Sequence, residues 1–234
     1  MNIKDSVILV TGANRGLGQE FAKQALARGA RKVYAAARDP ASVKLAGVTP
    51  VQLDVTDAAQ IAQAAAQLGD VNVLINNAGI ARIGGAVGEN SQVQLREQLE
   101  TNVFGILNLV QAFAPILAGH GGGAVLNVLS VLSWVNAPVI GGYGISKAAA
   151  WSLTNTLRHE LRKQGTLVTG LHAGFIDTDM TRGFEAPKAK PEDVVRQALD
   201  GLEAKAEEVF VDDTTRFVHG ALSSSVYLKD ILAG

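Results

Sequence analysis

Short apolar stretches alternate along the chain with longer stretches in which apolar and polar residues mix. The short stretches are rich in valine, leucine and isoleucine, which is typical of strands buried on both faces of a parallel sheet. They predict strands at 7–10, 32–37, 51–53, 71–75, 124–129, 167–171 and 208–211. The mixed stretches predict helices at 19–28, 58–68, 91–117, from 143 to about 163, and from Pro191 onward. This alternation indicates an α/β fold with a doubly wound parallel sheet and helices on both faces.

Aspartates and prolines mark several of the predicted helix boundaries. Asp57 is expected to cap the helix that follows it, and Asp39, which precedes a proline, to start a turn or short helix. Pro191 occupies a permitted position in a first helical turn, whereas Pro115 is expected to end or kink the long helix that contains it. No internal repeat, low-complexity segment or linker divides the chain, so we expect a single domain over residues 1–234.

The composition supports a large core and offers few features that bind ions or nucleic acid. Of the 234 residues 47% are hydrophobic, yet no uninterrupted apolar run approaches the length of a membrane span. The chain starts almost directly with a strand, which leaves no room for a secretory signal. The net charge is only −1, and acidic and basic residues are mixed along the chain, so the composition does not indicate binding to nucleic acid or to an anionic membrane. Because cysteine is absent, disulfides and thiolate-ligated metal sites are excluded. We expect a soluble, cytoplasmic protein without a metal.

A glycine-rich segment, Thr11–Gly18, separates the first strand from the first helix with the spacing G-x-x-x-G-x-G. Strand, glycine turn and helix together present backbone N–H groups and a helix N-terminus to a pyrophosphate. Tight turns between a strand and a helix favour glycine in any case. The pattern therefore predicts a dinucleotide site while leaving a purely structural role open.

Arg38 follows the second strand, where this type of fold places the adenosine ribose of a dinucleotide. An acidic residue there suits a free 2′-hydroxyl, whereas an arginine accommodates a 2′-phosphate. Arg15 lies in the glycine-rich segment, and two guanidinium groups are well suited to hold one phosphate. We therefore predict NADP(H) as the cofactor; the alternative is that Arg38 is a solvated loop residue.

Tyr143 and Lys147 are four positions apart and so share one face of a helix. A nearby ammonium favours the ionised phenol and is expected to lower the pKa of Tyr143. A tyrosine tuned in this way transfers a proton near neutral pH. Such pairs also arise by chance on helix surfaces, so the pair gains its meaning from the segments that precede it.

Taken in order, these segments resemble the short-chain dehydrogenase/reductase family, in its short single-domain branch with a Rossmann-type fold. The resemblance runs from Val7 to about Val211, and within the family the chain resembles NADP-preferring carbonyl reductases. The matching motifs are T-G-x-x-x-G-x-G at Thr11–Gly18, Asp54-Val55, N-N-A-G at Asn76–Gly79, Asn102, Ser130, Y-x-x-x-K at Tyr143–Lys147 and G-x-I-x-T at Gly174–Thr178.

The resemblance implies roles for four catalytic residues. Tyr143 resembles the proton donor to a carbonyl or the base toward an alcohol, and Lys147 the residue that binds the nicotinamide ribose and keeps the tyrosine acidic. Ser130, thirteen positions before Tyr143, resembles the hydroxyl that steadies the substrate oxygen; Ser133, ten positions before, is its rival. Asn102 resembles the asparagine whose main chain holds a water linked to Lys147. Without the other motifs, Asn102 would be interpreted as a solvated helix amide.

The resemblance also implies cofactor contacts along the carboxyl edge of the sheet. They comprise the phosphate contacts Gly12, Asn14, Arg15, Gly16, Leu17 and Gly18, the adenine contacts Asp54 and Val55, the ribose contacts Asn77, Ala78, Gly79, Tyr143 and Lys147, and the nicotinamide contacts Ile176 and Thr178. The chain departs from the family at His172-Ala173-Gly174, where a proline usually precedes the glycine. We expect His172 to be a strand-end residue and not a second acid.

The expected substrate side of the site is mainly apolar, which favours a hydrophobic ketone or aldehyde. Its predicted walls are Ala81, Arg82, Val131, Leu132, Trp134, Val139, Ile140, Phe175, Met180 and Phe184; for Val131, Leu132 and Val139 a place in the core is the preferred interpretation. Residues 178–190 are a candidate lid with Gly183 as a possible hinge. By resemblance we expect a homodimer or homotetramer that pairs through the helices of Asn102 and Tyr143.

The sequence therefore predicts an NADPH-dependent reductase of hydrophobic carbonyl compounds, reversible as an alcohol dehydrogenase. One alternative is a 3-oxoacyl-thioester reductase, against which stands the lack of a glycine-rich closing segment in residues 212–234. The other is a catalytically silent NADP(H)-sensing binding protein. Such a sensor would need no proton donor, and Ser130, Tyr143 and Lys147 are all present.

Overall fold

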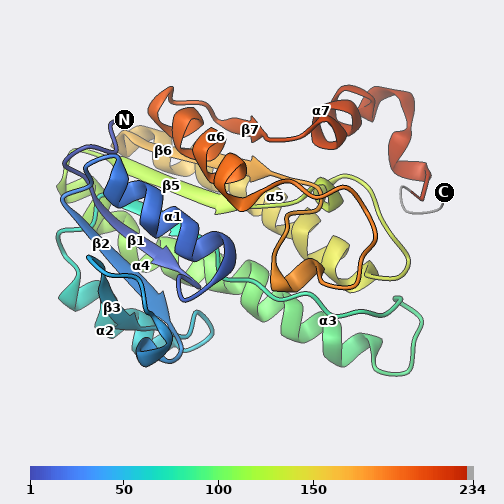
Figure 1. Ribbon diagram of the computed structural model, residues 1–234, viewed down its shortest axis with the longest axis horizontal. Coiled ribbons are helices and arrows are strands. Elements are labelled where there is room, and N and C mark those ends of the chain that lie inside the picture. The colour runs from blue at the N-terminus through green and yellow to red at the C-terminus, as the bar shows by residue number, and fades with distance from the viewer. Residues whose placement is uncertain (231–234) are drawn as a thin grey trace.

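The computed structural model describes residues 1–230 and holds a seven-stranded sheet flanked by helices (Figure 1). The strands are β1 (Val7–Thr11), β2 (Lys32–Ala37), β3 (Thr49–Gln52), β4 (Val73–Asn76), β5 (Gly123–Val128), β6 (Thr166–His172) and β7 (Glu208–Phe210). All pairs are parallel, in the order β3-β2-β1-β4-β5-β6-β7. The predicted single-domain, doubly wound Rossmann-type fold is confirmed.

Alternate residues of each central strand face opposite layers of helices. The helices are α1 (Gly16–Ala27), α2 (Ala58–Gln67), α3 (Ser91–Leu99), α4 (Gly105–Gly119), α5 (Gly141–Leu161), α6 (Pro191–Glu203) and α7 (Asp213–Gly220). In β1, Ile8 and Val10 pack in a core cluster with α1 and α6, whereas Val7 and Leu9 pack in a second cluster with α2, α4 and α5. Since a strand has a side-chain period of two, the continuous apolar runs supply both cores.

A third, smaller apolar cluster joins the loop after β5 to the C-terminal segment. Trp134 and Ile140 from the loop pack there with Val218 of α7. The sequence analysis missed α7, although a capping box marks its start: the Asp212 carboxylate accepts a hydrogen bond from the Thr215 N–H at 2.8 Å. The C-terminal segment therefore covers the loop that carries the candidate serine.

The predicted long helix is continuous, because a π-helical turn, Glu100–Phe104, joins α3 to α4. Of the two outcomes expected at Pro115, an end of the helix is excluded, since α4 runs on to Gly119; a kink there stays a prediction. A proline removes the hydrogen bond to the carbonyl four positions earlier, here that of Gln111. Pro115 and Gln111 are both exposed, so water can satisfy this carbonyl.

The helix Ser91–Gly119 is, by length and composition alone, long and apolar enough to cross a membrane. The sequence analysis did not anticipate this. Core helices pass the same test, and here Leu109, Phe113 and Leu117 are buried against the sheet. Packing in the core thus accounts for the apolar character of these residues.

Two of the helix starts predicted from aspartates are confirmed, whereas the first helix starts earlier than predicted. The Asp57 carboxylate caps α2 by accepting hydrogen bonds from the N–H groups of Ala59 (2.9 Å) and Gln60 (3.1 Å). Asp39 accepts from the N–H of Ala41 at 2.9 Å and starts the short 3-10 turn Pro40–Ser42. Helix α1 begins at Gly16 instead of residue 19, so the last three residues of the glycine-rich segment form its first turn.

The contact between α6 and β7 yields a test of the packing. A Cβ atom added at Gly201 would lie 2.3 Å from Cγ2 of Val209, whose branched side chain has little rotamer freedom. We expect Gly201→Ala to lower the free energy of unfolding by about 1–3 kcal/mol through overpacking. Urea unfolding measures this. In the control Gly119→Ala, where the new methyl meets nothing within 4 Å, we expect no loss; equal losses in both variants would contradict the packing.

Candidate active site

Hydrogen bonds hold the glycine-rich segment against the exit of β4. The Asn77 side-chain amide donates to the carbonyl oxygens of Thr11 (2.8 Å) and Gly12 (3.2 Å). The Thr11 hydroxyl accepts from the N–H groups of Asn77 and Ala78, both at 3.0 Å. The Asn77 side chain therefore fixes the segment, and the predicted contact of this residue with the cofactor ribose stays a prediction.

Gly18 is required by the close approach of α1 to this segment. A Cβ atom there would lie 2.2 Å from the Gly12 carbonyl oxygen and 2.5 Å from Nδ2 of Asn77. Side chains do not tolerate such distances. The last glycine of the motif thus serves packing, and it places the N-terminus of α1 directly behind the turn.

The N-terminus of α1 is open to an anion. Arg15 precedes it in an extended conformation and makes no side-chain cap, and no acidic residue lies in the first turn. The first N–H groups of the helix, at Gly16 and Leu17, and the positive end of the helix dipole are therefore available. With Gly12 and Asn14 in the preceding turn, the arrangement fits a pyrophosphate.

The two arginines predicted to bind a 2′-phosphate differ in their surroundings. Arg15 forms an ion pair with Asp179 at 2.9 Å, and Asp179 also pairs with Arg182. Arg38 is exposed at the end of β2. The Ala13 N–H donates to the carbonyl of Ala36 at 3.0 Å, so the glycine-rich segment lies beside the strand that Arg38 follows.

The predicted adenine contacts follow β3. The Asp54 carboxylate accepts from the N–H (2.9 Å) and the hydroxyl (2.8 Å) of Thr56. Val55 is buried, and a Cβ atom at Gly105 would lie 2.8 Å from its Cγ2. Val55 therefore packs at the end of the π-helical turn, and its contact with an adenine stays a prediction.

Ser130 and Tyr143 come from different elements, and the Ser130 side chain lies close enough to the Tyr143 phenol to affect its pKa. Ser130 follows β5, and its Oγ accepts from the N–H of Leu132 at 3.1 Å; Tyr143 lies in the first turn of α5. Burial raises the pKa of Tyr143 to about 12, and the Ser130 side chain opposes this rise. The phenol is therefore protonated at neutral pH, which is the form that donates a proton.

Lys147 lies one helical turn beyond Tyr143, with Nζ 5.6 Å from the centre of the tyrosine ring. It is only 5% exposed, and Nζ donates to the Val128 carbonyl at 2.7 Å. Burial lowers the pKa of Lys147 from 10.5 to about 8. The expectation of a lowered pKa for Tyr143 is wrong for this arrangement, because removal from water disfavours the charged form of both groups and the ammonium is bound to a carbonyl.

Asn102 is buried in the π-helical turn, a feature found often at functional sites. Its Oδ1 accepts from the Ile80 N–H, and its Nδ2 donates to the Ile80 carbonyl and the Ser146 hydroxyl, each at 2.9 Å. The Ser146 hydroxyl donates to the Tyr143 carbonyl at 2.8 Å. A Cβ atom at Gly79 would lie 3.2 Å from Oδ1 of Asn102. The solvated-amide interpretation is therefore wrong: Asn102 joins the loop after β4 to the helix of Tyr143. Its main-chain role toward a water stays a prediction.

Ser133, the rival of Ser130, is buried elsewhere in the same turn. Among residues 1–230 its hydroxyl has no hydrogen-bond partner. Of the two serines, only Ser130 affects the pKa of Tyr143. The geometry therefore favours Ser130 as the second donor of the site.

The candidate lid, residues 178–190, is tied at its base. The Asp177 N–H donates to the Ala189 carbonyl (2.9 Å), and the Ala189 N–H donates to the Phe175 carbonyl (2.8 Å). A Cβ atom at Gly16 would lie 3.7 Å from Cγ2 of Thr178, so this segment reaches the glycine turn. Ile176 precedes Thr178 at the same base. Closure of the segment over a substrate stays a prediction.

The predicted substrate walls divide into two groups. Val131, Leu132, Trp134 and Ile140 belong to the third apolar cluster, whereas Val139 and Met180 are 51% and 47% exposed. The core interpretation preferred for Val139 is therefore wrong. Two hollows of about 330 and about 190 Å³ lie between β3 and α2 and between α3 and the start of α5. Neither is lined by Ser130 or Tyr143, so the candidate site lies outside both hollows.

The comparison with known proteins identifies the family. The family model described as short chain dehydrogenase matches residues 6–189. The chain belongs to this family. A relative, the 3-oxoacyl-(acyl-carrier-protein) reductase FabG of Staphylococcus aureus, is 34% identical over 191 residues, which cover 74% of this chain and 75% of that protein. The chain is thus an oxidoreductase of the short-chain dehydrogenase family that acts on CH–OH or C=O groups, as predicted.

Two solved structures of short-chain dehydrogenases are similar over the whole chain. One, from Burkholderia cenocepacia and solved in complex with NADP, has a TM-score of 0.94 and 36% identity and covers 99% of each chain. Another, from Burkholderia phymatum and solved in complex with NAD, has a TM-score of 0.85 and 26% identity and covers 100% of each chain. The fold and the topology of the site are therefore those of a dinucleotide-dependent dehydrogenase.

Two carboxylates beside the site escaped the sequence analysis. Glu208 contacts the buried His172, whose Nε2 lies 2.7 Å from Oε2 of Glu208. Asp212 accepts from the Gly174 N–H at 2.7 Å. The position of His172 at the end of β6 agrees with its interpretation as a strand-end residue. No local pattern marks Glu208, because only the pairing of β6 with β7 brings it to the histidine; the capping box of α7 is the one available signal for Asp212.

The lowered pKa of Lys147 predicts a pH dependence. The ammonium is present below pH 8 and is lost as the pH rises through about 8, instead of near 10.5 as for an exposed lysine. We therefore expect kcat/KM for NADPH to fall about tenfold per pH unit well above this value, because this ratio reports groups of the free enzyme. In Lys147→Arg the charge persists, and the inflection should disappear. A wild-type profile that stays flat to pH 10 would contradict the assignment.

Proposed function

We propose that this dehydrogenase reduces the carbonyl group of a hydrophobic ketone or aldehyde with NADPH and catalyses the reverse oxidation of the alcohol. The observation that carries the proposal is that Ser130 and Lys147 both act on Tyr143 at the edge of the sheet where the glycine turn opens. The Ser130 side chain affects the pKa of the phenol, and Nζ of Lys147 lies 5.6 Å from the centre of the tyrosine ring. Protonated phenol and serine hydroxyl together form a donor pair for one carbonyl oxygen.

The protein's own groups manage the proton and the developing charge. The Tyr143 phenol donates its proton to the substrate oxygen, and the Ser130 hydroxyl donates a hydrogen bond to the same atom. Donors aimed at an oxygen that gains negative charge stabilise the transition state directly. The buried Lys147 ammonium adds a positive charge beside the phenol, which favours the tyrosinate left after the transfer.

The cofactor of this proposal is NADP(H), which supplies the hydride when bound. The open N-terminus of α1 would hold its pyrophosphate, and Arg15 and Arg38 would hold the 2′-phosphate. Support comes from the similar Burkholderia cenocepacia dehydrogenase, which was solved with NADP. Because the Burkholderia phymatum protein was solved with NAD, the choice between the two cofactors depends on this chain's own arginines.

The hydrophobic substrate is favoured by apolar side chains that remain exposed near the site. Ile83 is 73% exposed, and Val139 and Met180 are about half exposed. The Gly84 N–H donates to the Val139 carbonyl at 2.8 Å, so the segment of Ile83 lies beside the segment of Val139, which directly precedes the helix of Tyr143. Arg82, the one cation among the predicted walls, is paired with Glu97 at 3.1 Å, so it offers little to an anionic substrate.

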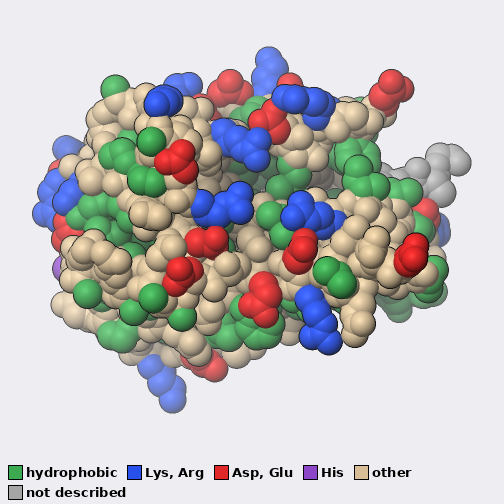
Figure 2. Space-filling view, turned by 90° about the horizontal axis from the view of Figure 1, so that it is seen from below, with side chains coloured by type: hydrophobic (Ala, Val, Ile, Leu, Met, Phe, Trp, Pro, Cys, Tyr) green, Lys and Arg blue, Asp and Glu red, His purple; other side chains and the backbone are tan. Residues whose placement is uncertain are grey.

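A 3-oxoacyl-thioester reductase is the second candidate, and the relatives favour it. Besides the Staphylococcus aureus protein, the FabG of Staphylococcus epidermidis is 30% identical over 230 residues. Residues 212–234 lack a glycine-rich closing segment, but this argument against a thioester reductase is weaker when such reductases are at least 30% identical to the chain. Residues 231–234 of that segment lie outside the described part of the chain. On the face seen in Figure 2, Lys and Arg side chains are interspersed with Asp and Glu. That surface offers no continuous basic patch to an acidic carrier protein, so we keep the free carbonyl compound as first choice.

We further propose a cytoplasmic homodimer or homotetramer that pairs through the helix Ser91–Gly119 and α5. Phe104 and Ile145 on these helices are 45% and 40% exposed, which supports a contact there. Trp151, by contrast, packs edge-to-face on Trp134, with ring centres 6.1 Å apart, so its ring belongs in part to the core.

A panel of carbonyl compounds tests the proposal. With NADPH we expect faster reduction of aryl and medium-chain ketones and aldehydes than of acetoacetyl-coenzyme A, followed by the loss of NADPH absorbance. Tyr143→Phe removes the proton donor and should lower kcat about 10²–10⁴-fold, with NADPH binding within about twofold of wild type. Preferred turnover of the thioester would support the second candidate. Activity retained in the Phe variant would contradict the role of Tyr143.

The choice of nicotinamide cofactor has its own test. Arg38→Asp should raise KM for NADPH far more than KM for NADH, because it replaces a phosphate partner by a repelling carboxylate. We expect the ratio of KM for NADPH to KM for NADH to rise about 10²-fold, which corresponds to the loss of two charge-assisted hydrogen bonds. Arg31→Asp, an exposed arginine just before the other end of β2, is the matched control. Equal losses with both cofactors would remove the 2′-phosphate role of Arg38.

A further inference from the structure

The buried ring of His172 lies directly behind the candidate serine. It is 0% exposed and stacks on Trp134, with ring centres 4.0 Å apart. Its Nδ1 lies 3.3 Å from the Ser130 carbonyl oxygen and its Nε2 lies 2.7 Å from Oε2 of Glu208. Both ring nitrogens thus lie within hydrogen-bonding distance of an oxygen from another element. His172 therefore links β7 to the backbone of Ser130.

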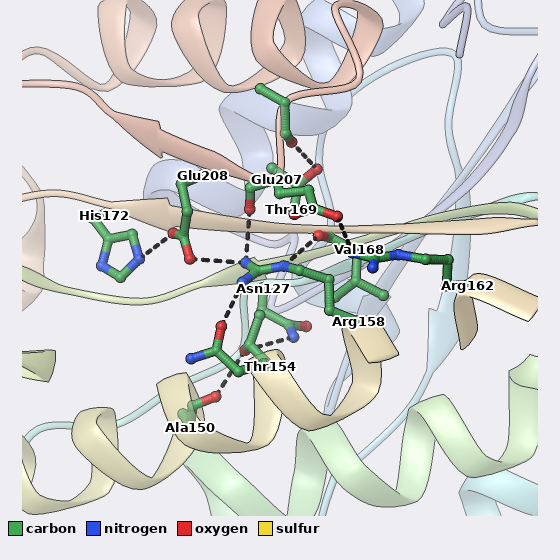
Figure 3. A network of polar contacts seen from close by, with 12 residues as sticks. Asn127, Ala150, Thr154, Arg158, Arg162, Val168, Thr169, His172, Glu207 and Glu208 are labelled. Atoms are coloured by element: carbon green, nitrogen blue, oxygen red, sulfur yellow. Dashed lines mark hydrogen bonds and ion pairs between the residues drawn. The ribbon is translucent and has the colours of Figure 1, made fainter. Parts of the chain in front are cut away.

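Glu208 is held in turn by a buried arginine (Figure 3). Its Oε1 accepts from Nη2 of Arg158 at 2.9 Å. Arg158 is 8% exposed and also donates to the carbonyls of Glu207 (2.7 Å) and Val168 (3.1 Å). Burial raises the pKa of Glu208, but the hydrogen bond and charge of His172 and the charge of Arg158 outweigh this and lower it. The carboxylate is thus ionised and fixed from two sides.

Asp212 holds the backbone after β6 in the same way as Glu208 holds His172, but at Gly174, two residues further along the chain. Its Oδ2 accepts from the Gly174 N–H at 2.7 Å, while its Oδ1 caps α7 through the Thr215 N–H. The Gly174 turn leads to Ile176 and Thr178, the predicted nicotinamide contacts. A carboxylate–amide hydrogen bond is charge-assisted and therefore strong.

The serine loop is fastened to the residue between these two contacts. The Val131 N–H donates to the Ala173 carbonyl at 2.9 Å. The serine loop thus contacts His172 through Ser130 and Ala173 through Val131. The residues on either side of Ala173, His172 and Gly174, contact the carboxylates Glu208 and Asp212 of the C-terminal segment. Among residues 1–230 the Ala173 N–H donates no hydrogen bond, so the turn itself carries little restraint of its own.

We propose that Glu208 and Asp212 are positioning residues, which hold His172 and Gly174 and so fix the serine loop and the nicotinamide-side turn relative to each other. The effect on catalysis rests on the proposed function, because it assumes that Ser130 steadies the substrate oxygen. Small displacements of such a donor lower the rate steeply, which is why a clamp behind it matters to turnover.

The test compares each carboxylate with its own neighbour. Glu208→Gln leaves an amide that can accept from only one of His172 and Arg158. Asp212→Asn retains a good helix cap but turns an N–H donor group toward Gly174. The matched controls are Glu207→Gln and Asp213→Asn, whose side chains pair with Arg162 and Arg216 on the surface. Each pair makes the same charge change at adjacent positions.

We expect a split between the kinetic constants. Glu208→Gln should lower kcat about tenfold, with KM for NADPH within about twofold, because it releases the serine loop. Asp212→Asn should lower kcat too, and in addition it should raise KM for NADPH about fivefold, because it releases the nicotinamide-side turn. Both controls should match wild type. A loss shared by test and control variants would overturn the proposal.

Amide hydrogen exchange supplies a readout that needs no substrate. The Val131 amide should exchange about tenfold faster in Glu208→Gln, and the Gly174 amide about tenfold faster in Asp212→Asn. If the wild type turns over no carbonyl compound, the proposed function fails. Amide exchange still tests whether Glu208 and Asp212 hold His172 and Gly174 in place. Unchanged exchange at both amides would overturn the clamp whatever the activity.

A rescue separates positioning from loss of stability. Because His172 is in a strand and the Ala173 N–H is unused, proline at 173 is compatible with the fold and restricts the turn. Ala173→Pro added to Asp212→Asn should return KM for NADPH to within about twofold of wild type. If the double variant regains thermal stability without regaining KM, Asp212 is a structural residue only and the proposal fails.

Discussion

All seven strands run in the same direction, and this single constraint decides where chemistry is possible. Loops that leave parallel strands at their carboxyl ends open at one edge, whatever their separation along the chain. The glycine turn after β1, the loop after β4, Ser130 after β5 and the Gly174 turn after β6 therefore share one side of the molecule. The sheet's core, built from residues on both faces of each strand, keeps these exits in register.

Buried and half-buried polar side chains hold the exits together at that edge. Asn77 fixes the glycine turn, Asn102 joins the loop after β4 to α5, and His172 with Glu208 supports the loop after β5. Each side chain is satisfied by specific partners, because an unpaired polar group in the core would cost about 1–3 kcal/mol. The same contacts that avoid this cost orient the catalytic groups.

Removal from water shapes the electrostatics of the site. Burial raises the pKa of Tyr143 to about 12 and lowers that of Lys147 to about 8. Each shift favours the neutral form, so the tyrosine keeps the proton that it donates. The lysine charge is thus sensitive to the mildly alkaline range, where its loss removes support for the tyrosinate.

Local patterns in the sequence determined the alternating elements, the family motifs and the pairing of Tyr143 with Lys147 on one helix turn, because these depend on residues close together in the chain. They failed where distant segments meet. The raised pKa of Tyr143, the structural use of Asn77 and the contacts of Glu208 with His172 and of Asp212 with Gly174 all depend on burial or on neighbours from other elements. Desolvation and long-range hydrogen bonds exist only once the sheet is assembled, so the tertiary structure alone decided them.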